Sequence, residues 1–216
     1  TAIADGGIRI WELDDDVFTS PMINHGIGSP EFEMSPDGRW LAVMQKPVVL
    51  LARLESGQFT DFMRLEGTND NIAAVAFSPD MSWFAAGSKG RTNLWDLSAE
   101  DPRSAVIALT GFEDFVDSVS FTPDSNSIAT GCFDGSIRLW DLSSRDEQQT
   151  RESQTLILEA NTDRVLANHC VTISPDGRWL ASGDWQATVR LWDLQDLSRP
   201  PRTWKAHDES ITHVTF

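Results

Sequence analysis

Short apolar runs alternate with tight polar turns along the whole chain. Runs such as residues 72–77 and 116–121 have the length and composition of β-strands, and each leads into a Ser-Pro-Asp or Thr-Pro-Asp sequence. Proline fixes its own φ angle and a glycine permits positive φ, so these sequences predict sharp chain reversals. The pattern predicts an all-β protein built from short antiparallel strands joined by turns.

Two motifs recur in alternation. The first surrounds the Pro-Asp turn, at residues 34–42, 77–85, 121–129 and 173–181. The second ends in tryptophan followed by an acidic residue, at residues 8–13, 92–97, 137–142 and 189–194, with a degenerate copy at 49–54 that has Ala52 in place of tryptophan. Its anchor positions 11, 52, 95, 140 and 192 are separated by 41, 43, 45 and 52 residues. Four strand-sized runs in a period of about 40–45 residues predict one blade of a β-propeller per repeat.

These Trp-Asp dipeptides and (Ser/Thr)-Pro-Asp turns resemble the WD-repeat family, and the resemblance covers essentially the whole chain. It implies an all-β β-propeller of four-stranded antiparallel blades, with five repeat units. The expected units are residues 1–29 together with 207–216, then 30–66, 67–110, 111–160 and 161–206. Two arrangements remain open: a closed five-blade ring, in which residues 1–4 pair with 211–216, or part of a larger, seven-bladed ring.

The resemblance also implies a buried hydrogen-bond tetrad in each blade, made of a histidine, a serine or threonine, an aspartate and the repeated tryptophan. Only one complete set is expected, and it consists of His207, Thr1, Asp5 and Trp11. Other repeats lack members, because Phe112 takes the histidine position beside Trp140 and Ala85 takes the hydroxyl position beside Trp95. A satisfied network fixes one packing of the buried polar groups.

Charged residues recur beside the anchor tryptophans. Arginine stands two residues before the tryptophan at positions 9, 138 and 190, which puts it on the same face of the strand. We expect its stem to lie along apolar surface and its guanidinium to pair with a neighbouring aspartate. The aspartates that follow the tryptophans, at 96, 141 and 193, are expected to hold turns or to bond to the next blade. The polar insertion at residues 143–155 is expected to be a flexible surface loop, or alternatively a docking loop.

The partner-binding candidates are the aromatic residues at the positions where the family presents ligand contacts. They are Phe115, Phe133 and Trp185, and His169 is a further candidate at the same rim. Exposed, clustered aromatic side chains are typical anchors for a protein partner. The alternative interpretation is that the rings simply pack on one another.

Composition narrows the possible ligands. The chain of 216 residues has 33 acidic and 17 basic side chains and a net charge of −16, which disfavours nucleic acid and anionic membranes. No segment approaches the ~20 apolar residues of a membrane span. Cys132 and Cys170 lack metal-ligand spacing and the four histidines are scattered, so we expect no metal or cofactor. We expect the two cysteines to be buried thiols, as in a protein of a reducing, cytoplasmic compartment. The first residue is Thr1, so we expect an excised or processed chain.

The sequence therefore predicts a non-catalytic scaffold or sensing module that binds a protein or peptide. It contains no GxSxG, HExxH or glycine-rich phosphate motif, so an enzyme is disfavoured. Two alternatives are a structural or oligomerising subunit, and a regulatory domain excised from a larger signalling ATPase, kinase or protease. Fold alone does not decide among these roles.

Overall fold

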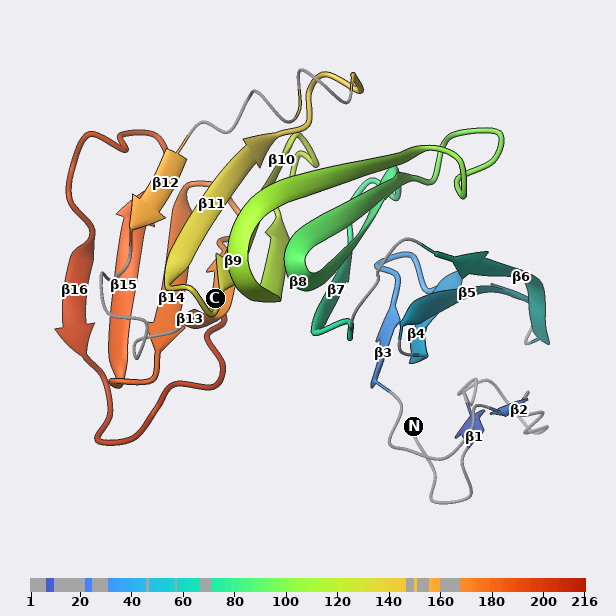
Figure 1. The fold of residues 1–216 in the computed structure, drawn as a ribbon, viewed down its shortest axis with the longest axis horizontal. Helices are drawn as coiled ribbons and strands as arrows, with labels where there is room; N and C mark the ends of the chain where they lie inside the picture. The colour runs from blue at the N-terminus through green and yellow to red at the C-terminus, as the bar shows by residue number, and fades with distance from the viewer. Residues whose placement is uncertain are drawn as a thin grey trace. The chain divides into compact units, whose positions relative to one another are not determined.

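A computed structural model describes residues 7–9, 22–24, 31–45, 47–56, 58–66, 71–146, 150, 156–159 and 168–216. The chain divides into two compact units, residues 1–69 and 70–216 (Figure 1). All sixteen described elements are strands, and every pairing between them is antiparallel, as the alternation of apolar runs and turns predicts. No described residue belongs to a helix with the length and apolar character that a membrane crossing requires.

The first unit contains a two-stranded pair and a four-stranded sheet. The pair is β1 (Gly7–Arg9) with β2 (Met22–Asn24). The sheet has the order β3 (Glu31–Met34), β4 (Trp40–Gln45), β5 (Val48–Glu55) and β6 (Gln58–Leu65). Leu41, Val43 and Ala52 form its buried core. The degenerate repeat therefore still forms a third strand, because the smaller Ala52 remains a fully buried apolar residue.

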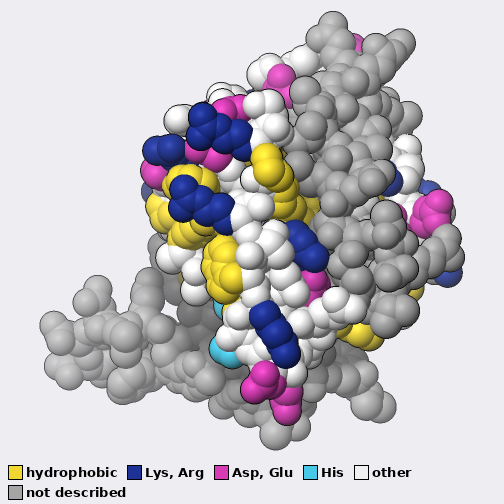
Figure 2. Space-filling model, turned by 90° about the vertical axis from the view of Figure 1, so that its left-hand side faces the viewer, with side chains coloured by type: hydrophobic (Ala, Val, Ile, Leu, Met, Phe, Trp, Pro, Cys, Tyr) yellow, Lys and Arg dark blue, Asp and Glu magenta, His cyan; other side chains and the backbone are white. Residues whose placement is uncertain are grey.

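The second unit contains a four-stranded sheet and a six-stranded sheet. The four-stranded sheet has the order β13 (Asn168–Ile173), β14 (Trp179–Asp184), β15 (Thr188–Asp193) and β16 (Arg202–Lys205). The six-stranded sheet runs in the order β12 (Leu156–Glu159), β11 (Ser136–Asp141), β10 (Ser127–Cys132), β9 (Val106–Phe121), β8 (Trp83–Asp96) and β7 (Ala74–Phe77). Figure 2 views the molecule from the side on which β16 lies in Figure 1.

The six-stranded sheet is two four-stranded repeats joined without a break. β8 folds back on itself at Gly90, where φ is +74°, so the amide of Leu97 reaches the carbonyl of Ser82 at 2.8 Å. β9 pairs with β8 through residues 106–110 and with β10 through 116–121, and turns at Gly111 with φ of 98°. Each long strand thus corresponds to two consecutive strands of the expected repeat. Figure 1 shows β8 and β9 as long, curved ribbons.

The four Pro-Asp turns share one hydrogen-bond pattern. In the turn at Ser78, the hydroxyl donates to Asp80 at 2.7 Å and accepts from the amide of Trp83 at 2.9 Å. The turns that begin at Ser35, Thr122 and Ser174 repeat both contacts. Because all partners lie within five residues, the turns form locally, and the sequence prediction of sharp reversals here is confirmed.

The repeated tryptophans lie in the core. Trp95, Trp140 and Trp192 are all buried, while Trp11 lies outside the described residues. A second apolar cluster spans two repeats, since Ala129 and Ile137 pack with Val171, Ile173, Leu180 and Trp192. Face-to-face packing of successive four-stranded sheets is the construction of a β-propeller.

The predicted ring closure stays a prediction. Residues 1–4 lie outside the described residues, and residues 211–216 form none of the assigned strands. Ile211 itself is buried, and its amide donates to the carbonyl of Asp184 at 3.0 Å.

The two cysteines are buried and free, and burial raises the pKa of the Cys132 thiol to about 12.

Candidate protein-interaction site

Two turns at the same position of successive repeats carry large aromatic side chains. Phe133 lies in the turn between β10 and β11, and its amide donates to the carbonyl of Phe115 at 2.9 Å. Trp185 lies in the turn between β14 and β15, where the carboxylate of Asp184 accepts the amides of Gln186 and Thr188, both at 2.9 Å. Both rings therefore stand on turns that hydrogen bonds hold in place.

The rings of Phe133 and Trp185 meet across the boundary between the two repeats. Their centroids are 6.3 Å apart with an interplanar angle of 68°, an edge-to-face arrangement. The backbone of Phe115 adjoins that of Phe133 through their hydrogen bond, and the Nζ atom of Lys89 lies 5.9 Å from the centroid of the Phe115 ring. We call Lys89, Phe115, Phe133 and Trp185 the aromatic rim.

The contact between the rings does not bury them. Trp185 is 49% exposed, whereas Phe133 and Phe115 are half-buried. The structure thus unites both interpretations of the sequence: the rings pack on one another, and one of them still presents a large apolar surface to solvent. Aromatic surface held in one orientation is what a protein partner can use as an anchor.

The other predicted site residues are placed less completely. His169 belongs to β13, but its side chain lies outside the described part of the structure. Thr1, Asp5 and Trp11 also lie outside the described residues, and His207 is exposed. The tetrad of these four residues therefore stays a prediction.

In the repeats of Trp140 and Trp95, the indole N–H of the repeated tryptophan is hydrogen-bonded where the hydroxyl residue of the tetrad is present, and it has no partner in the described part of the chain where that residue is missing. The indole N–H of Trp140 donates to the hydroxyl of Thr130 at 3.2 Å, while Phe112, at the histidine position, packs its ring 6.0 Å from that of Trp140. In the preceding repeat Ala85 offers no hydroxyl. There the indole nitrogen of Trp95 is buried with no hydrogen-bond partner among the described residues.

Asp184 is a buried charged residue beside the aromatic rim that the sequence pattern did not single out. Its side chain has no exposed surface, and its Oδ2 atom accepts a hydrogen bond from Arg190 Nη1 at 2.6 Å. The turn position at which the family has its tetrad aspartate holds Gln186 in this repeat, so the carboxylate stands two residues earlier than the family pattern predicts. The sequence feature that could have predicted the ion pair is an aspartate at the end of a strand of small residues, six positions before an arginine.

The predicted arginine–aspartate pairing is confirmed for Arg190 and wrong for Arg138. The guanidinium carbon of Arg138 lies 4.3 Å from the ring centroid of Phe112, and its Nη1 donates to the carbonyl of Thr110 at 3.4 Å. The physical reason is the residue at the end of the preceding strand, which is Cys132 here and Asp184 in the next repeat. The side chain of Arg9 lies outside the described part of the chain.

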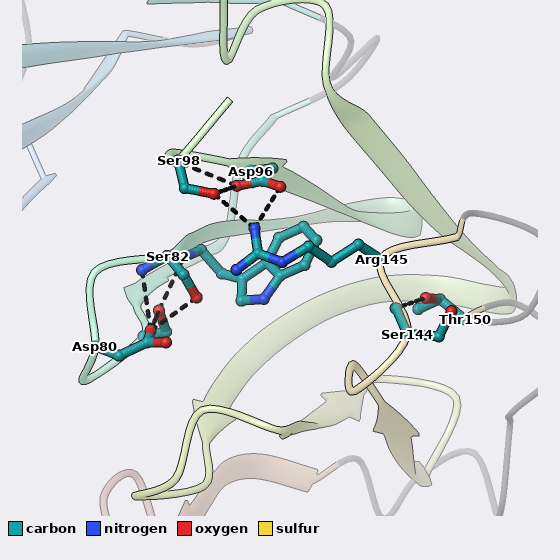
Figure 3. Close-up of polar contacts among 9 residues, drawn as sticks. Asp80, Ser82, Asp96, Ser98, Ser144, Arg145 and Thr150 are labelled. Carbon is teal, nitrogen blue, oxygen red and sulfur yellow. Dashed lines mark hydrogen bonds and ion pairs between the residues drawn. The ribbon is translucent and has the colours of Figure 1, made fainter. Parts of the chain in front are cut away.

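The aspartates that follow the tryptophans each accept a backbone amide of their own turn. One of them, Asp96, also joins two repeats (Figure 3). Asp96 accepts the amide of Ser98 at 2.9 Å and the Nη1 of Arg145 at 2.5 Å. The guanidinium of Arg145 also lies 5.3 Å from the centroid of the Trp83 ring. Partial burial opposes ionisation of Asp96, but the hydrogen bonds from Arg145 and Ser98 hold its pKa below the ordinary value.

Arg145 anchors the start of the insertion at residues 143–155, while the expectation of a flexible or docking loop for the rest of it stays a prediction. Its side chain anchors the start of that loop to the neighbouring repeat, 49 residues earlier in the chain. The hydroxyl of Thr150 adds a bond to the carbonyl of Ser144 at 2.9 Å. The remaining positions of the insertion lie outside the described residues.

Comparisons with known proteins agree with the repeat pattern. Residues 60–96, 104–141 and 152–193 match the family model described as WD domain, G-beta repeat. The chain is 30% identical to the LST8 homolog protein of Drosophila melanogaster over 192 residues, which are 85% of this chain and 57% of that protein. It is 24% identical to the target of rapamycin complex subunit wat1 of Schizosaccharomyces pombe over 218 residues, 98% of this chain and 65% of that protein.

A third relative shares a shorter stretch. The chain is 33% identical to the protein groucho of Drosophila melanogaster over 140 residues, 64% of this chain and 17% of that protein. The chain thus spans a little more than half the length of the LST8 homolog and less than two thirds of wat1.

Proposed function

Since this chain belongs to the WD-repeat family, we propose that it is a non-catalytic scaffold that binds a protein or peptide through the aromatic rim. The observation that supports this most directly is the edge-to-face contact of Phe133 and Trp185, which come from equivalent turns of neighbouring repeats. Tryptophan at the centre of an interface is among the side chains that contribute most to binding energy.

The chemistry of the rim favours contact over reaction. Three of its four residues are aromatic, and the fourth, Lys89, has its ammonium group over the Phe115 ring. The net charge of −16 argues against a polyanionic ligand at this surface. A partner with an apolar side chain to cover the exposed indole of Trp185 fits these residues best.

We propose further that the partner is a component of a multiprotein assembly. Relatives of this chain are named as subunits of a target of rapamycin complex. The anchored turns also support such a role, because a surface whose side chains are already held in position loses little conformational entropy on binding.

A capture experiment tests the rim. The chain and its Phe133→Ala/Trp185→Ala variant are immobilised, retained proteins are identified by mass spectrometry, and the affinity for the recovered partner is then measured. We expect the double variant to bind that partner at least about thirtyfold more weakly, as the loss of a hot spot of about 2 kcal/mol implies.

Phe62→Ala is the matched control. Phe62 is also a large exposed aromatic residue, but it lies on β6 rather than on the rim. Circular dichroism and thermal melting verify that every variant folds. Equal affinity of the double variant and the wild type would show that the rim is not the binding site.

A further inference from the structure

The turn that follows β8 presents a serine hydroxyl group beside an arginine of the next repeat. The Oγ atom of Ser98 donates to Asp96 Oδ1 at 2.5 Å and accepts from Arg145 Nη1 at 2.6 Å (Figure 3). Ser98 itself is exposed. An exposed hydroxyl group and a cation are therefore already in contact at this position.

The exposure of Ser98 follows from its place in the repeat. Ser143 occupies the same position of the next repeat, two residues after the aspartate of the Trp-Asp dipeptide, and the amides of both serines bond to that aspartate. The repeat that contains Ser143 packs against a described repeat on each side. Ser143 is nevertheless exposed as well. Packing between successive repeats therefore leaves this turn position open to solvent.

Arg145 has unused hydrogen-bond donors at this site. Its bonds to Asp96 and Ser98 both come from Nη1, and its Nε and Nη2 atoms form no hydrogen bond with the described residues. The guanidinium carbon lies 5.3 Å from the centroid of the buried Trp83 ring, which holds the group in place. A guanidinium is a planar fork of five donors that binds a phosphate group through two parallel hydrogen bonds. The side chain is thus positioned for an anion with more oxygen atoms than Asp96 provides.

The residues after Ser98 suit a protein kinase with a basic substrate groove. Residues 97–105 belong to no strand and connect β8 to β9, so they can enter a groove with little loss of sheet pairing. Glu100 and Asp101 lie two and three residues after Ser98, and Arg103 is the one basic residue of this segment. Arg103 pairs with Asp101 at 2.8 Å, but both side chains are exposed, so the pair opposes opening only weakly. The net negative charge of the segment complements such a groove.

We propose that Ser98 is a phosphorylation site whose phosphate group is bound by Arg145. A kinase transfers the γ-phosphoryl group of ATP to the Oγ atom of Ser98. The bond between the γ-phosphorus and its bridging oxygen breaks, the bond from Oγ to phosphorus forms, ADP leaves, and the hydroxyl proton passes to a base of the kinase. The product carries a charge of about −1.5 to −2 and three acceptor oxygens near neutral pH. Asp96 loses the hydroxyl donor and is repelled by the phosphate, so the phosphate takes its place on Arg145.

The phosphate group strengthens the connection between the two repeats. Arg145 lies at the start of the insertion at residues 143–155, and in the unmodified chain it holds that start through one nitrogen atom and the single charge of Asp96. A phosphate engages a second nitrogen of the guanidinium and carries more charge than a carboxylate. Phosphorylation of Ser98 therefore fixes the start of the insertion more firmly to the preceding repeat.

Treatment of the full chain with ATP and a casein kinase, which requires acidic residues after the serine, tests the modification. Mass spectrometry of the digested product locates the phosphate, and we expect it on Ser98. The variant Glu100→Gln/Asp101→Asn removes the two carboxylates that follow and should be modified at Ser98 at least about tenfold more slowly, because the groove of the kinase loses its charged partners.

The rate at which alkaline phosphatase removes the phosphate tests the role of Arg145. A phosphate bound by a guanidinium must leave it before it enters the phosphatase. Arg145→Gln should therefore lose its phosphate at least about threefold faster than the wild type, as the loss of about 0.7 kcal/mol of pairing implies. Arg145→Lys keeps the charge without the planar fork and should react at an intermediate rate.

Arg103→Gln is the matched control. It makes the same change of charge in the same turn region, but Arg103 bonds to Asp101 rather than to Ser98. Its phosphate should be removed at a rate within about twofold of the wild type. Circular dichroism verifies that every variant folds.

Three results would overturn the proposal. The first is a wild-type chain without phosphate on Ser98 after kinase treatment. The second is equal dephosphorylation rates of the wild type and Arg145→Gln, which would show that the guanidinium does not bind the phosphate. The third is an equal acceleration by Arg145→Gln and Arg103→Gln, which would indicate a general effect of charge instead of a specific contact.

Discussion

The buried ion pair of Asp184 and Arg190 is expected to contribute strongly to the stability of the last sheet. Asp184 has no exposed side-chain surface, Arg190 is 12% exposed, and their charged atoms lie 2.6 Å apart. Asp184→Asn preserves the shape but removes the charge that Arg190 faces. Removing one partner of a buried ion pair strands the other, so we expect a loss of about 3–5 kcal/mol in the free energy of unfolding.

The carboxylate of Asp184 has a second task that raises the expected cost. Its Oδ1 atom accepts the amides of Gln186 and Thr188, so an asparagine must turn its carbonyl oxygen either toward these amides or toward Arg190. The substitution leaves at least one buried donor without its partner. For a domain stabilised by about 5–15 kcal/mol, this is a large share of the total.

Urea unfolding, followed by tryptophan fluorescence and analysed by linear extrapolation, measures the loss. A double-mutant cycle with Arg190→Met isolates the coupling, and the double variant should recover part of the loss because neither charge remains. Asp196→Asn with Arg199→Met, an exposed pair, is the matched control and should show coupling of no more than about 1 kcal/mol. A loss below about 1 kcal/mol for Asp184→Asn, or an additive cycle, would refute the reasoning.

For three further substitutions, the structure determines whether the protein becomes more or less stable. Thr130→Val should lower the free energy of unfolding by about 1–3 kcal/mol in urea titrations, because the buried indole N–H of Trp140 loses its acceptor. Burial raises the pKa of Asp117 from 3.8 to about 7, so its folded-state carboxyl binds a proton more tightly than the unfolded one and stability falls as pH rises through this window. Asp117→Asn should therefore melt higher than wild type at pH 8, with the difference closing near pH 4, and an equal difference at both values would contradict this. Arg145→Ala should lower the free energy of unfolding by about 1 kcal/mol or less, and the loss should shrink at high salt in thermal melts, because the Arg145 side chain of the pair with Asp96 is half exposed.

The features that could be predicted from sequence depend on residues close together in the chain. The Pro-Asp turns are an example, since Ser78, Asp80 and Trp83 make their contacts within five residues. The burial of Trp95 and Trp140 followed from their repetition at strand positions. The candidate site was also partly predictable, because Phe133 and Trp185 occupy the same position of successive repeats, and equivalent positions of stacked repeats come together.

The features that escaped prediction depend on which distant segments meet. Sequence could place Arg138 and Arg190 on equivalent strand positions, but one stacks on Phe112 and the other pairs with Asp184. Arg145 was assigned to a flexible loop, although it reaches Asp96 across 49 residues of chain. The composition of a loop does not reveal whether it is anchored when the carboxylate that anchors it lies in another repeat.

The amino-acid sequence by itself determined the repeat, its strands, its turns and its core tryptophans, because backbone geometry and local hydrogen bonds dictate them within a few residues. Tertiary structure alone decided the partner of each arginine, the merging of consecutive strands in β8 and β9, and the exposure of Trp185. A long charged side chain takes the best partner within its reach, and an aromatic ring stays exposed only where no neighbouring repeat covers it. Both outcomes depend on the packing of whole sheets, which no single repeat encodes.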